Sequence, residues 1–520
     1  MLAVGIALTL GGTGGLAGLL VGCGGGSTPL VSPPPVPAVQ ALQVADVQNI
    51  VQAAVNSVNV DMVAAVVDRA GFVLGVFRTQ NAPVTAIGNF GQTQNANDVA
   101  VALARTGAFF SNDQAPLSSR TVRFISGIHF PPGVMNQPPA DLYGIENTNR
   151  GCTLINDPIF EGRIPPSLAL GGGFGLGVLT GKVDTNDSNA TAVNPGGLPI
   201  FYKNVVVGGI GVVTSSGSLN VAEYAAFAGS TTTRSGPTDT FGPSPVAPGV
   251  VFIGGIALPF VNQTLLPAGF SAGPVAGTGS YLVAATNSSG QPPEGDLIPP
   301  TAGPLGGLSA ADVTQILDNA EATANTTRAA IRLPPGSTTR MVIAVADLDG
   351  TIIGLRRMQD STVFSIDVAA TKARNMVYFN SASRTAADLN GVPMGTAVTN
   401  RTISFGAQPL YPPGIDASNA GPFFNLYTMD VADPCTQGFQ GGAANSNKSG
   451  IVFFPGSAGL FRSGALVGGL GVSGDGVDQD DYVTNGGTKG FEAPASIRAD
   501  QIMDQGVRLP YFKFPRNPTN

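Results

Sequence analysis

A short pattern that occurs twice constrains the fold of this chain more than any other feature of its sequence. The first copy, Met62–Arg78, reads MVAAVVDRAGFVLGVFR, and the second, Met341–Arg357, reads MVIAVADLDGTIIGLRR. Each copy has two runs of small and β-branched residues around a turn that opens with Asp and closes with Gly. Asp favours such turns by bonding its own backbone, and Gly accepts a positive φ angle. The repeat therefore predicts a β-hairpin in each of two homologous domains.

Helical patterns flank both hairpins in the same order. The apolar spacing predicts helices over 42–54 and 98–110 in the first copy and over 308–320 and 367–379 in the second. Loops rich in Pro and Gly follow, and glycine-rich runs at 198–212 and 459–472 predict another hairpin in each copy. Closely spaced glycines within a strand allow a backbone or a ligand to approach closely, at a cost in strand stability.

The composition limits the classes of function that the chain can have. Its 520 residues include 71 Gly and 41 Pro, and only 11% are charged, which is typical of a folded, turn-rich protein. The net charge of -7, without a basic stripe, argues against binding to nucleic acid. The single histidine excludes a metal site built from several histidines of one chain.

The start of the chain has the pattern of an exported protein. Residues 1–22 are apolar and end in Leu20-Val21-Gly22-Cys23, which resembles the processing site of bacterial lipoproteins. We expect a signal peptide over 1–22, lipidation of Cys23 and a flexible tether over 23–40, although no Lys or Arg precedes the apolar run. A plain secretory peptide and a short membrane helix are the alternatives. The expected location is the bacterial cell envelope, with the lipid at Cys23 as the membrane contact and the protein facing the periplasm or the exterior.

Two further cysteines occupy comparable places in the two copies. Export favours a disulfide between Cys152 and Cys435. Two separate buried thiols are the alternative, because a sequence does not give the distance between two Cα atoms.

These patterns divide the mature chain into two domains, a connector and a tail. The domains are expected at 41–229 and 307–496. The Pro- and Gly-rich connector, 230–306, contains an apolar run over 250–261 that looks like a strand joining one of the sheets. The tail, 497–520, is expected to begin with a helix over 497–503 and to end in an extended segment that packs against the core.

The motifs that recur, and the order in which they recur, resemble one known family. In the first copy they are Ala65-Val66-Val67-Asp68, Gly71, Arg78, Gly196-Gly197-Leu198-Pro199 and Gly208-Gly209-Ile210-Gly211-Val212. In the second copy they are Ala344-Val345-Ala346-Asp347, Gly350, Gly354, the glycine-rich run 468–474 and Val477-Asp478-Gln479-Asp480-Asp481. Together they resemble the GlcG/HbpS-like haem-binding family, also called the haem-degrading domain, over 42–227 and 308–483.

The resemblance implies both a fold and a ligand. The implied fold class is α+β, with two tandem profilin- or PAS-like domains, each an antiparallel β-sheet flanked by helices. The implied cofactor and partner is haem or a related tetrapyrrole, bound by a protein that often forms a homo-oligomer.

A few side chains are candidates for binding such a ligand. His129 could be an axial ligand of the haem iron, and the second copy has Leu410 at the matching place. Arg120 and Arg401 open the duplicated loops and could pair with haem propionates. Tyr411 could ligate or flank the porphyrin, as could Tyr143, Tyr202 and Tyr427. Each of these side chains also has a purely structural interpretation, as a loop, core or rim residue.

Other motifs give weaker signals. The acidic residues Asp475, Asp478, Asp480 and Asp481 could hold a hard cation, or could simply favour the first turn of the last helix. The glycine-rich runs lack the Lys-Ser/Thr of a phosphate loop, and no G-x-S-x-G motif accompanies His129. No catalytic residue can be assigned.

The sequence therefore predicts a lipid-anchored, two-domain haem-binding protein that scavenges, stores or senses haem. One alternative is a non-catalytic interaction module of the envelope that presents its Pro- and Gly-rich loops to another protein. Another alternative is an enzyme that degrades haem or a related tetrapyrrole.

Overall fold

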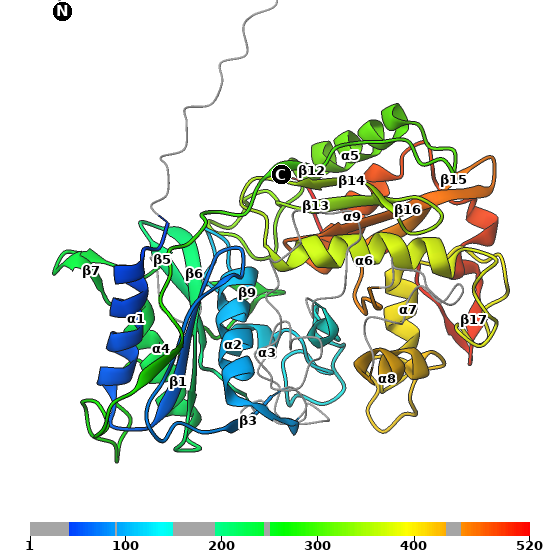
Figure 1. Ribbon diagram of the computed structural model, residues 1–520. Helices are drawn as coiled ribbons and strands as arrows, with labels where there is room; N and C mark the ends of the chain where they lie inside the picture. Colours follow the sequence, from blue (N-terminus) through cyan, green and yellow to red (C-terminus); the bar gives the residue numbers. More distant parts are fainter. Residues whose placement is uncertain (1–40, 89–90, 149–192, 244–249, 433–448, 520) are drawn as a thin grey trace, which may run out of the picture. The chain divides into compact units, whose positions relative to one another are not determined.

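The computed structural model describes residues 41–88, 91–148, 193–243, 250–432 and 449–519 (Figure 1). Its two largest sheets are five-stranded and antiparallel, and each is flanked by helices, so the predicted α+β class is confirmed. The predicted signal peptide and tether lie outside the described residues, as do Cys23, Cys152 and Cys435. Within the described residues, no helix is both long enough and apolar enough to span a bilayer.

The first repeat builds the sheet β11-β2-β1-β6-β5. Its elements are α1 (Val44–Ser57), β1 (Met62–Asp68), β2 (Val73–Arg78), β3 (Thr85–Ile87), β4 (Thr93–Asn95), α2 (Ala96–Phe110), α3 (Ser119–Phe124), a 3₁₀ turn (Ile145–Asn147), β5 (Gly197–Tyr202), β6 (Val205–Thr214), α4 (Leu219–Ser230), β7 (Thr233–Gly236) and β8 (Asp239–Thr240).

The second repeat builds the equivalent sheet β12-β14-β13-β16-β15. Its elements are α5 (Ala310–Ala324), β13 (Val342–Ala346), β14 (Ile352–Arg357), α6 (Phe364–Phe379), α7 (Asn400–Gly406), α8 (Phe424–Ala432), β15 (Ser457–Arg462), β16 (Ala465–Ser473) and α9 (Val477–Gly487). The matching strand order shows that the repeated sequence pattern corresponds to a repeated fold.

The duplicated hairpins form at the predicted places, β1–β2 and β13–β14. Gly71 and Gly350 close the turns with φ angles of 92° and 84°. The side chains of the two opening aspartates differ in that only that of Asp68 bonds its own turn in the described hydrogen bonds. Asp68 accepts hydrogen bonds from Ala70 N and Phe72 N within its own turn, as predicted. Both carboxylates also hold the connector, since Asp68 accepts from the hydroxyls of Ser288 and Ser289 and Asp347 accepts from the N–H groups of Leu305 and Gly306.

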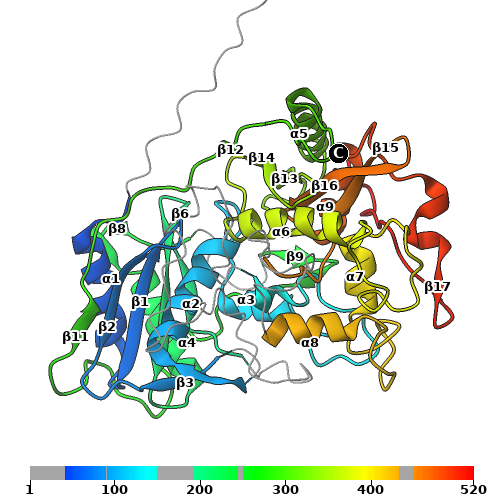
Figure 2. The ribbon, with the colours of Figure 1, turned by 45° about the vertical axis from the view of Figure 1, so that its right-hand side comes forward.

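Each sheet is covered by helices on both faces (Figures 1 and 2). In the first repeat, α2 packs on one face and α1 and α4 pair on the other, and in the second repeat α6 and the pair α5 and α9 do the same. The central helices lie unusually close to their strands. A Cβ on Gly211 would stand 1.9 Å from the carbonyl oxygen of Ala100, and one on Gly471 would stand 2.1 Å from that of Ala369. The glycine-rich strands therefore serve close backbone approach.

A continuous hydrophobic core joins the two repeats where their central helices meet. The rings of Phe110, at the end of α2, and Phe364, at the start of α6, stack with centroids 4.2 Å apart. Val363 N donates to Phe109 O across the same junction at 3.1 Å. Buried residues of both helices belong to one apolar cluster. Neither repeat thus closes its own core at this end.

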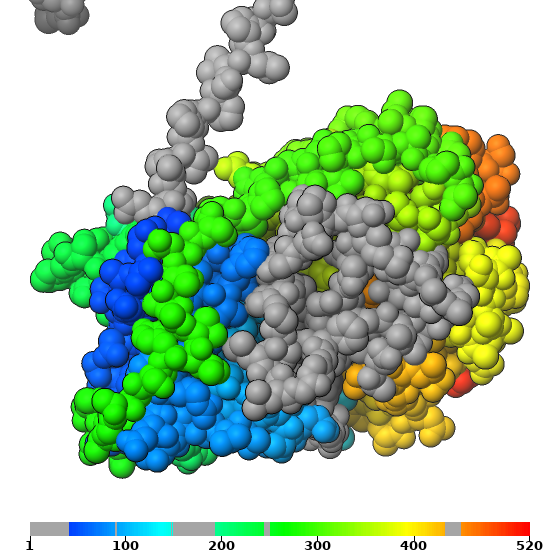
Figure 3. Space-filling model, viewed as in Figure 1, coloured from blue at the N-terminus to red at the C-terminus, as the bar shows by residue number. Residues whose placement is uncertain are grey.

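The connector takes part in both sheets, but not through the segment predicted from the sequence. The apolar run 250–261 contains β9 (Phe252–Ile253) and β10 (Ile256–Ala257), which pair only with each other. The strands that join the large sheets are β11 (Ser280–Val283), at the edge beside β2, and β12 (Gly295–Ile298), at the edge beside β14. Figure 3 shows the connector crossing the surface from the first repeat to the second.

The tail also differs from its prediction. Instead of a helix over 497–503 it has two 3₁₀ turns, Ala495–Ile497 and Ala499–Gln501, followed by the hairpin of β17 (Met503–Asp504) and β18 (Val507–Arg508). The extended segment after it does pack back, since Leu509 and Tyr511 are buried.

The β9–β10 and β17–β18 hairpins are equivalent parts of the two repeats. Each runs into a Leu-Pro-aromatic segment, at 258–260 and at 509–511. In the first repeat, Pro259 O and Phe260 O accept hydrogen bonds from the hydroxyls that cap α3. In the second, Pro510 O and Tyr511 O accept from the hydroxyls that cap α7. The predicted connector and tail thus each contain the last hairpin of a repeat.

Replacing Gly211 with Ala should destabilise the protein, because its Cβ would collide with a helix backbone that cannot move alone. We expect the free energy of unfolding to fall by about 3 kcal/mol, the upper end for overpacking of a core. Urea denaturation measures this loss. Gly217→Asn is the matched control, since Gly217 has a φ angle of 64° and open space around its Cβ, and Asn tolerates that φ. Equal losses in the two variants would contradict this account.

Candidate ligand-binding cavity between the repeats

A cavity of about 290 Å³ lies where loops of the two repeats meet. The first repeat contributes residues 138–141 and Tyr143, and the second contributes α7, residues 453–455 and the start of α9. The walls are largely apolar, with Pro139, Phe405 and Phe453 among them. Hydrogen bonds fix the aromatic wall, since Asn400 Nδ2 donates to Val452 O at 2.5 Å. The cavity is therefore preformed by ordered loops, as ligand sites usually are.

Charged groups stand at one side of this cavity and pair with one another. Arg401 donates from Nε to Asp481 and from a terminal nitrogen to Asp478 at 2.7 Å. Lys513 Nζ lies 2.9 Å from the other oxygen of Asp478, and the Lys513 side chain is 66% exposed. Because Arg401 is occupied by two carboxylates, Lys513 is the cation of the described lining that can turn to an incoming anion.

Asp141 also lines this cavity, and its carboxylate forms no ion pair with a described residue. The side chain is half-buried, and no other described residue donates a hydrogen bond to it. Burial raises the pKa of Asp141 to about 6; the nearby charge of Asp478 adds to the shift, while Lys513 and Arg401 oppose it. Asp141 is therefore a half-buried carboxylate that no described side chain neutralises directly.

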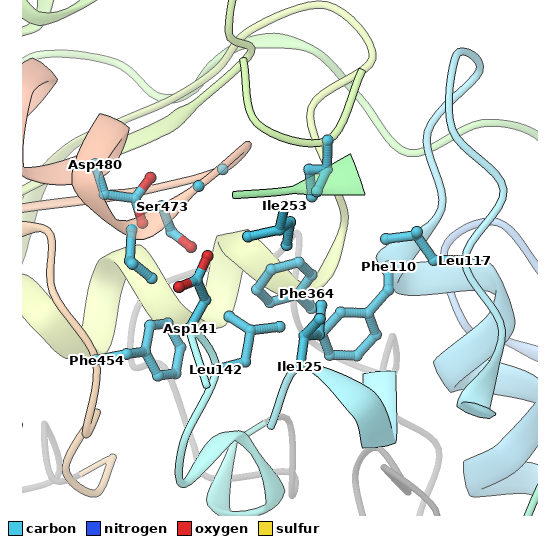
Figure 4. A pocket seen from close by; sticks show the side chains of 14 residues that line it. Phe110, Leu117, Ile125, Asp141, Leu142, Ile253, Phe364, Phe454, Ser473 and Asp480 are labelled. Atoms are coloured by element: carbon cyan, nitrogen blue, oxygen red, sulfur yellow. The ribbon is translucent and has the colours of Figure 1, made fainter. Parts of the chain in front are cut away.

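A second cavity, of about 20 Å³, adjoins the first and shares Asp141, Phe454 and Val477 with it (Figure 4). Figure 4 shows Asp141, Ser473 and Asp480 at one end of this cavity and Phe110 and Phe364 at the other. The volume suffices for about one water molecule. Asp480 is only 2% exposed, and its Oδ1 has no hydrogen-bond partner among the described residues.

Asp480 belongs to a buried ion pair that only the second repeat has. Lys372 Nζ donates to Asp480 Oδ2 at 3.0 Å and to Val472 O at 2.7 Å. Burial is the largest cause of the pKa shift of each partner. It lowers the pKa of Lys372 and raises the pKa of Asp480. The equivalent positions of the first repeat are the apolar residues Leu103 and Ala222. The two repeats therefore share a fold and differ in the chemistry next to the cavities.

The two predicted propionate-binding arginines lie at equivalent places and bond equivalent partners. Arg120 donates from Nε and a terminal nitrogen to the two oxygens of Glu223 at 2.7 and 2.8 Å. Arg401 instead divides its donors between two carboxylates on the last helix of its own repeat, with Nε bonded to Asp481 and a terminal nitrogen to Asp478. Glu223 and Asp481 are fully buried, so each arginine neutralises a buried carboxylate. Arg401 also lines the larger cavity, whereas Arg120 lines neither cavity.

His129 lies outside both cavities, where it joins the loops of the two repeats. Its Nε2 is 2.7 Å from Asp416 Oδ1, and the other oxygen of Asp416 accepts from Asn136 N at 2.8 Å. The side chain is nearly buried. The structure thus gives His129 a contact between loops, and its assignment as an iron ligand stays a prediction.

The candidate tyrosines divide between the cavity and the core. The hydroxyl of Tyr411 donates to Asp504 O at 3.2 Å, and its ring meets the edge of Phe405, which lines the cavity. Tyr143 lines the cavity itself, stacks on Tyr427 with centroids 5.0 Å apart and shares a hydrogen bond with it. Tyr202 stacks against Arg234 and lines neither cavity.

Sequence reasoning missed Asp141 and Lys372. Asp141-Leu142-Tyr143 corresponds to Asn425-Leu426-Tyr427 in the other repeat. The first repeat therefore has a charged Asp141 where the second has the neutral Asn425. Lys372 is the lysine of α6 and stands at the position of Leu103 in the first repeat. Both signals can be read from the alignment of the repeats, but neither shows that the side chain is next to a cavity.

The fold defines a tandem pair of antiparallel α+β repeats with a cavity between them, and part of the second repeat is similar to a known family. Residues 308–489 match the family described as haem degrading protein HbpS-like. The match does not extend to the first repeat, whose relation to the second is carried by the shared strand order. No curated protein matches the chain.

Two solved structures are similar to part of the chain. One is the Klebsiella pneumoniae protein ORFY, with 18% identity over 35% of this chain and 90% of that chain and a TM-score of 0.23. The other is a complex of PduOC with haem, with 24% identity over 36% of this chain and 96% of that chain and a TM-score of 0.23.

The cavity fits the ring and carboxylates of a haem better than its iron. The apolar walls suit a flat macrocycle, and Lys513 can face a propionate. Haem iron is usually held by His, Cys, Met or Tyr, and Tyr143 is the only side chain of these types in the described lining. Its hydroxyl is already bonded to Tyr427. The described residues also contain no cluster of three or more His, Cys, Asp or Glu that could hold a metal. The described lining therefore does not supply a free axial ligand.

Replacing Asp141 with Asn should stabilise the protein at neutral pH. The raised pKa, about 6, means that the folded protein binds this proton more tightly than the unfolded chain does. Stability contributed by the protonated group is present below pH 4 and is lost as the pH rises through about 6. We therefore expect Asp141→Asn to raise the free energy of unfolding by about 1–2 kcal/mol at pH 7 and to leave it unchanged near pH 4.

The pH series is measured by urea denaturation. Asp318→Asn is the control, because Asp318 is exposed and paired with Arg356. Asp318→Asn should lower the free energy of unfolding slightly at pH 7, whereas Asp141→Asn should raise it. If Asp141→Asn destabilised the protein at pH 7, Asp141 would have a stabilising partner, and this account of its carboxylate would be wrong.

Proposed function

We propose that the protein binds haem or a related tetrapyrrole in the cavity between its two repeats, and that it scavenges, stores or senses this ligand. The observation that carries the proposal is the match of residues 308–489 to the HbpS-like haem-degrading family. The cavity supports it, because the described part of that domain contributes an apolar wall and a cationic side chain to one concave site.

The residues of the cavity suggest how the ligand is held. The rings of Phe405, Phe453 and Phe454 offer apolar surface to a flat macrocycle, and burial of that surface drives binding. Lys513, at the open side, can exchange its contact with Asp478 for a ligand carboxylate. Haem, when bound, would supply an iron centre capable of redox chemistry, and no catalytic step is assigned to the chain.

Titration of the purified protein with hemin should give saturable binding and a shifted Soret band. Ser404→Trp should weaken binding at least tenfold, because Ser404 lines the cavity and the indole would fill it. Gln315→Trp is the matched control, since Gln315 is exposed on α5 and does not line the cavity. Absence of saturable binding to the unmodified protein would refute the proposal.

The same titration decides the ligand assignments made from the sequence. A changed Soret position in His129→Ala would support His129 as an axial ligand, and an unchanged one would leave it a contact between loops. Weaker binding in Arg120→Ala, with the fold intact, would support a propionate contact for Arg120.

We further propose that the protein is held in the cell envelope by a lipid at Cys23, as the sequence before it suggests. In a bacterial host, the unmodified protein should sediment with the membranes and enter the detergent phase. Cys23→Ser should be found in the soluble fraction, because it cannot be acylated. Equal membrane association of both forms would exclude this anchor.

A further inference from the structure

The equivalent arginines of the two repeats use their donors differently. Arg120 places both on one carboxylate, since Nε and a terminal nitrogen bond the two oxygens of Glu223. Arg401 places only Nε on Asp481, the residue that corresponds to Glu223. The side chain of aspartate is one methylene shorter than that of glutamate, and the second oxygen of Asp481 accepts from Gly456 N at 3.0 Å. A terminal nitrogen of Arg401 is therefore left for a group in the cavity lining.

Asp478 bonds that nitrogen and joins it to a second cation. One oxygen of Asp478 accepts from Arg401 at 2.7 Å, and the other lies 2.9 Å from Lys513 Nζ. All three residues line the larger cavity. The first repeat has the neutral Asn220 at the position of Asp478. The second repeat therefore has a carboxylate between two cations at a place where the first repeat has none.

The contacts of Asp478 are those that a carboxylate of a bound molecule would make. Each of its two oxygens meets one cation, and such charge-assisted bonds are the usual way in which proteins recognise carboxylates. Asp478 is partly exposed, so rotation of its side chain can carry the carboxylate into water without moving α9. Lys513 is 66% exposed, and an ion pair this open to solvent contributes little. Exchange of one carboxylate for another at this place therefore costs little.

Arg401 stays in place during such an exchange. Its Nε remains bonded to Asp481, which is fully buried. Asp481 is fixed in turn, because its oxygens accept from the N–H groups of Gly456 and Lys513. The guanidinium is thus held with a terminal nitrogen directed to the cavity lining, and a donor held in this way loses little freedom when an anion binds to it.

We propose that Asp478 is an internal competitor of the ligand: it holds Arg401 and Lys513 together before a ligand binds, and a carboxylate carried by an apolar ring displaces it from both cations. The inference rests on the proposed function, which is tetrapyrrole binding, and adds what sets the affinity of that site. The exchange replaces ion pairs by ion pairs, so no covalent bond forms or breaks. A site whose competent form is only partly populated binds its ligand more weakly by that fraction. Asp478 therefore lowers the affinity of the site that it keeps assembled.

Titration of the full chain with hemin at pH 8, followed at the Soret band, tests the competition. Asp478→Asn should bind hemin about fivefold more tightly, because the neutral amide holds the two cations less strongly. Asp312→Asn is the matched control, since Asp312 stands in the first turn of α5, pairs with Arg462 at 3.0 Å and lines neither described cavity. It removes the same charge and should leave the affinity unchanged. A variant that merely folded poorly would lose affinity instead of gaining it.

Two comparisons separate this competition from a change in the general charge of the cavity. Hemin dimethyl ester has no carboxylate, so it should bind Asp478→Asn and the unmodified protein equally. In a Lys513→Met background the gain from Asp478→Asn should shrink, because one of the two cations that Asp478 holds is then missing.

The outcomes distinguish this inference from the proposed function. Unchanged or weaker hemin binding by Asp478→Asn would overturn the inference and leave tetrapyrrole binding standing. The same gain with the dimethyl ester, or in the Lys513→Met background, would overturn it in the same way. Failure of hemin to bind either the unmodified protein or Asp478→Asn would overturn both.

Discussion

The close contact between a helix backbone and a glycine-rich strand organises both halves of this protein. Carbonyl oxygens of α2 and α6 occupy the space in which Cβ atoms of Gly211 and Gly471 would stand. Because the contact is backbone to backbone, it fixes the height and direction of each helix more firmly than interchangeable side chains would. The ends of the two helices then meet at Phe110 and Phe364, and the shared core grows from that stack. The position of the cavity follows from this arrangement, since its smaller neighbour is lined by the same two rings.

The fold could be predicted where the signal is local and repeated. The turn residues of the duplicated hairpin and the apolar spacing of α1, α2, α5 and α6 placed these elements correctly. The edge strands β11 and β12 were missed because they are short and half-exposed, and because their partners are far away in sequence. Tyr281, for example, belongs in β11 because its ring meets the edge of Phe77 at 5.1 Å, a contact that no local pattern reveals. The predicted tail helix failed because apolar spacing over one turn also suits 3₁₀ turns beside a hairpin.

The site could be predicted only in part, for a related reason. The repeat identified Arg120 and Arg401 as a matched pair, but their partners Glu223 and Asp481 lie on helices distant in sequence. Without these partners, a buried guanidinium and a propionate-binding one look alike in a sequence. Asp141 poses the opposite problem, since its importance lies in the absence of a partner among the described residues. An absent hydrogen bond is a property of the packed loops, and it has no pattern of its own.

The two repeats share the residues that build the fold and differ in charged residues next to the described cavities. Positions that hold the sheets and helices together are alike in both copies, including the glycines, the hydroxyl caps of α3 and α7, and the arginine that clamps the last helix. Next to the cavities the copies diverge, since Lys372 and Asp480 replace Leu103 and Ala222, and Asp141 stands opposite Asn425 in the alignment. Buried charges generally stabilise a fold no better than apolar residues of similar volume. The two repeats therefore share the contacts that build the fold and differ in the charged side chains next to the described cavities.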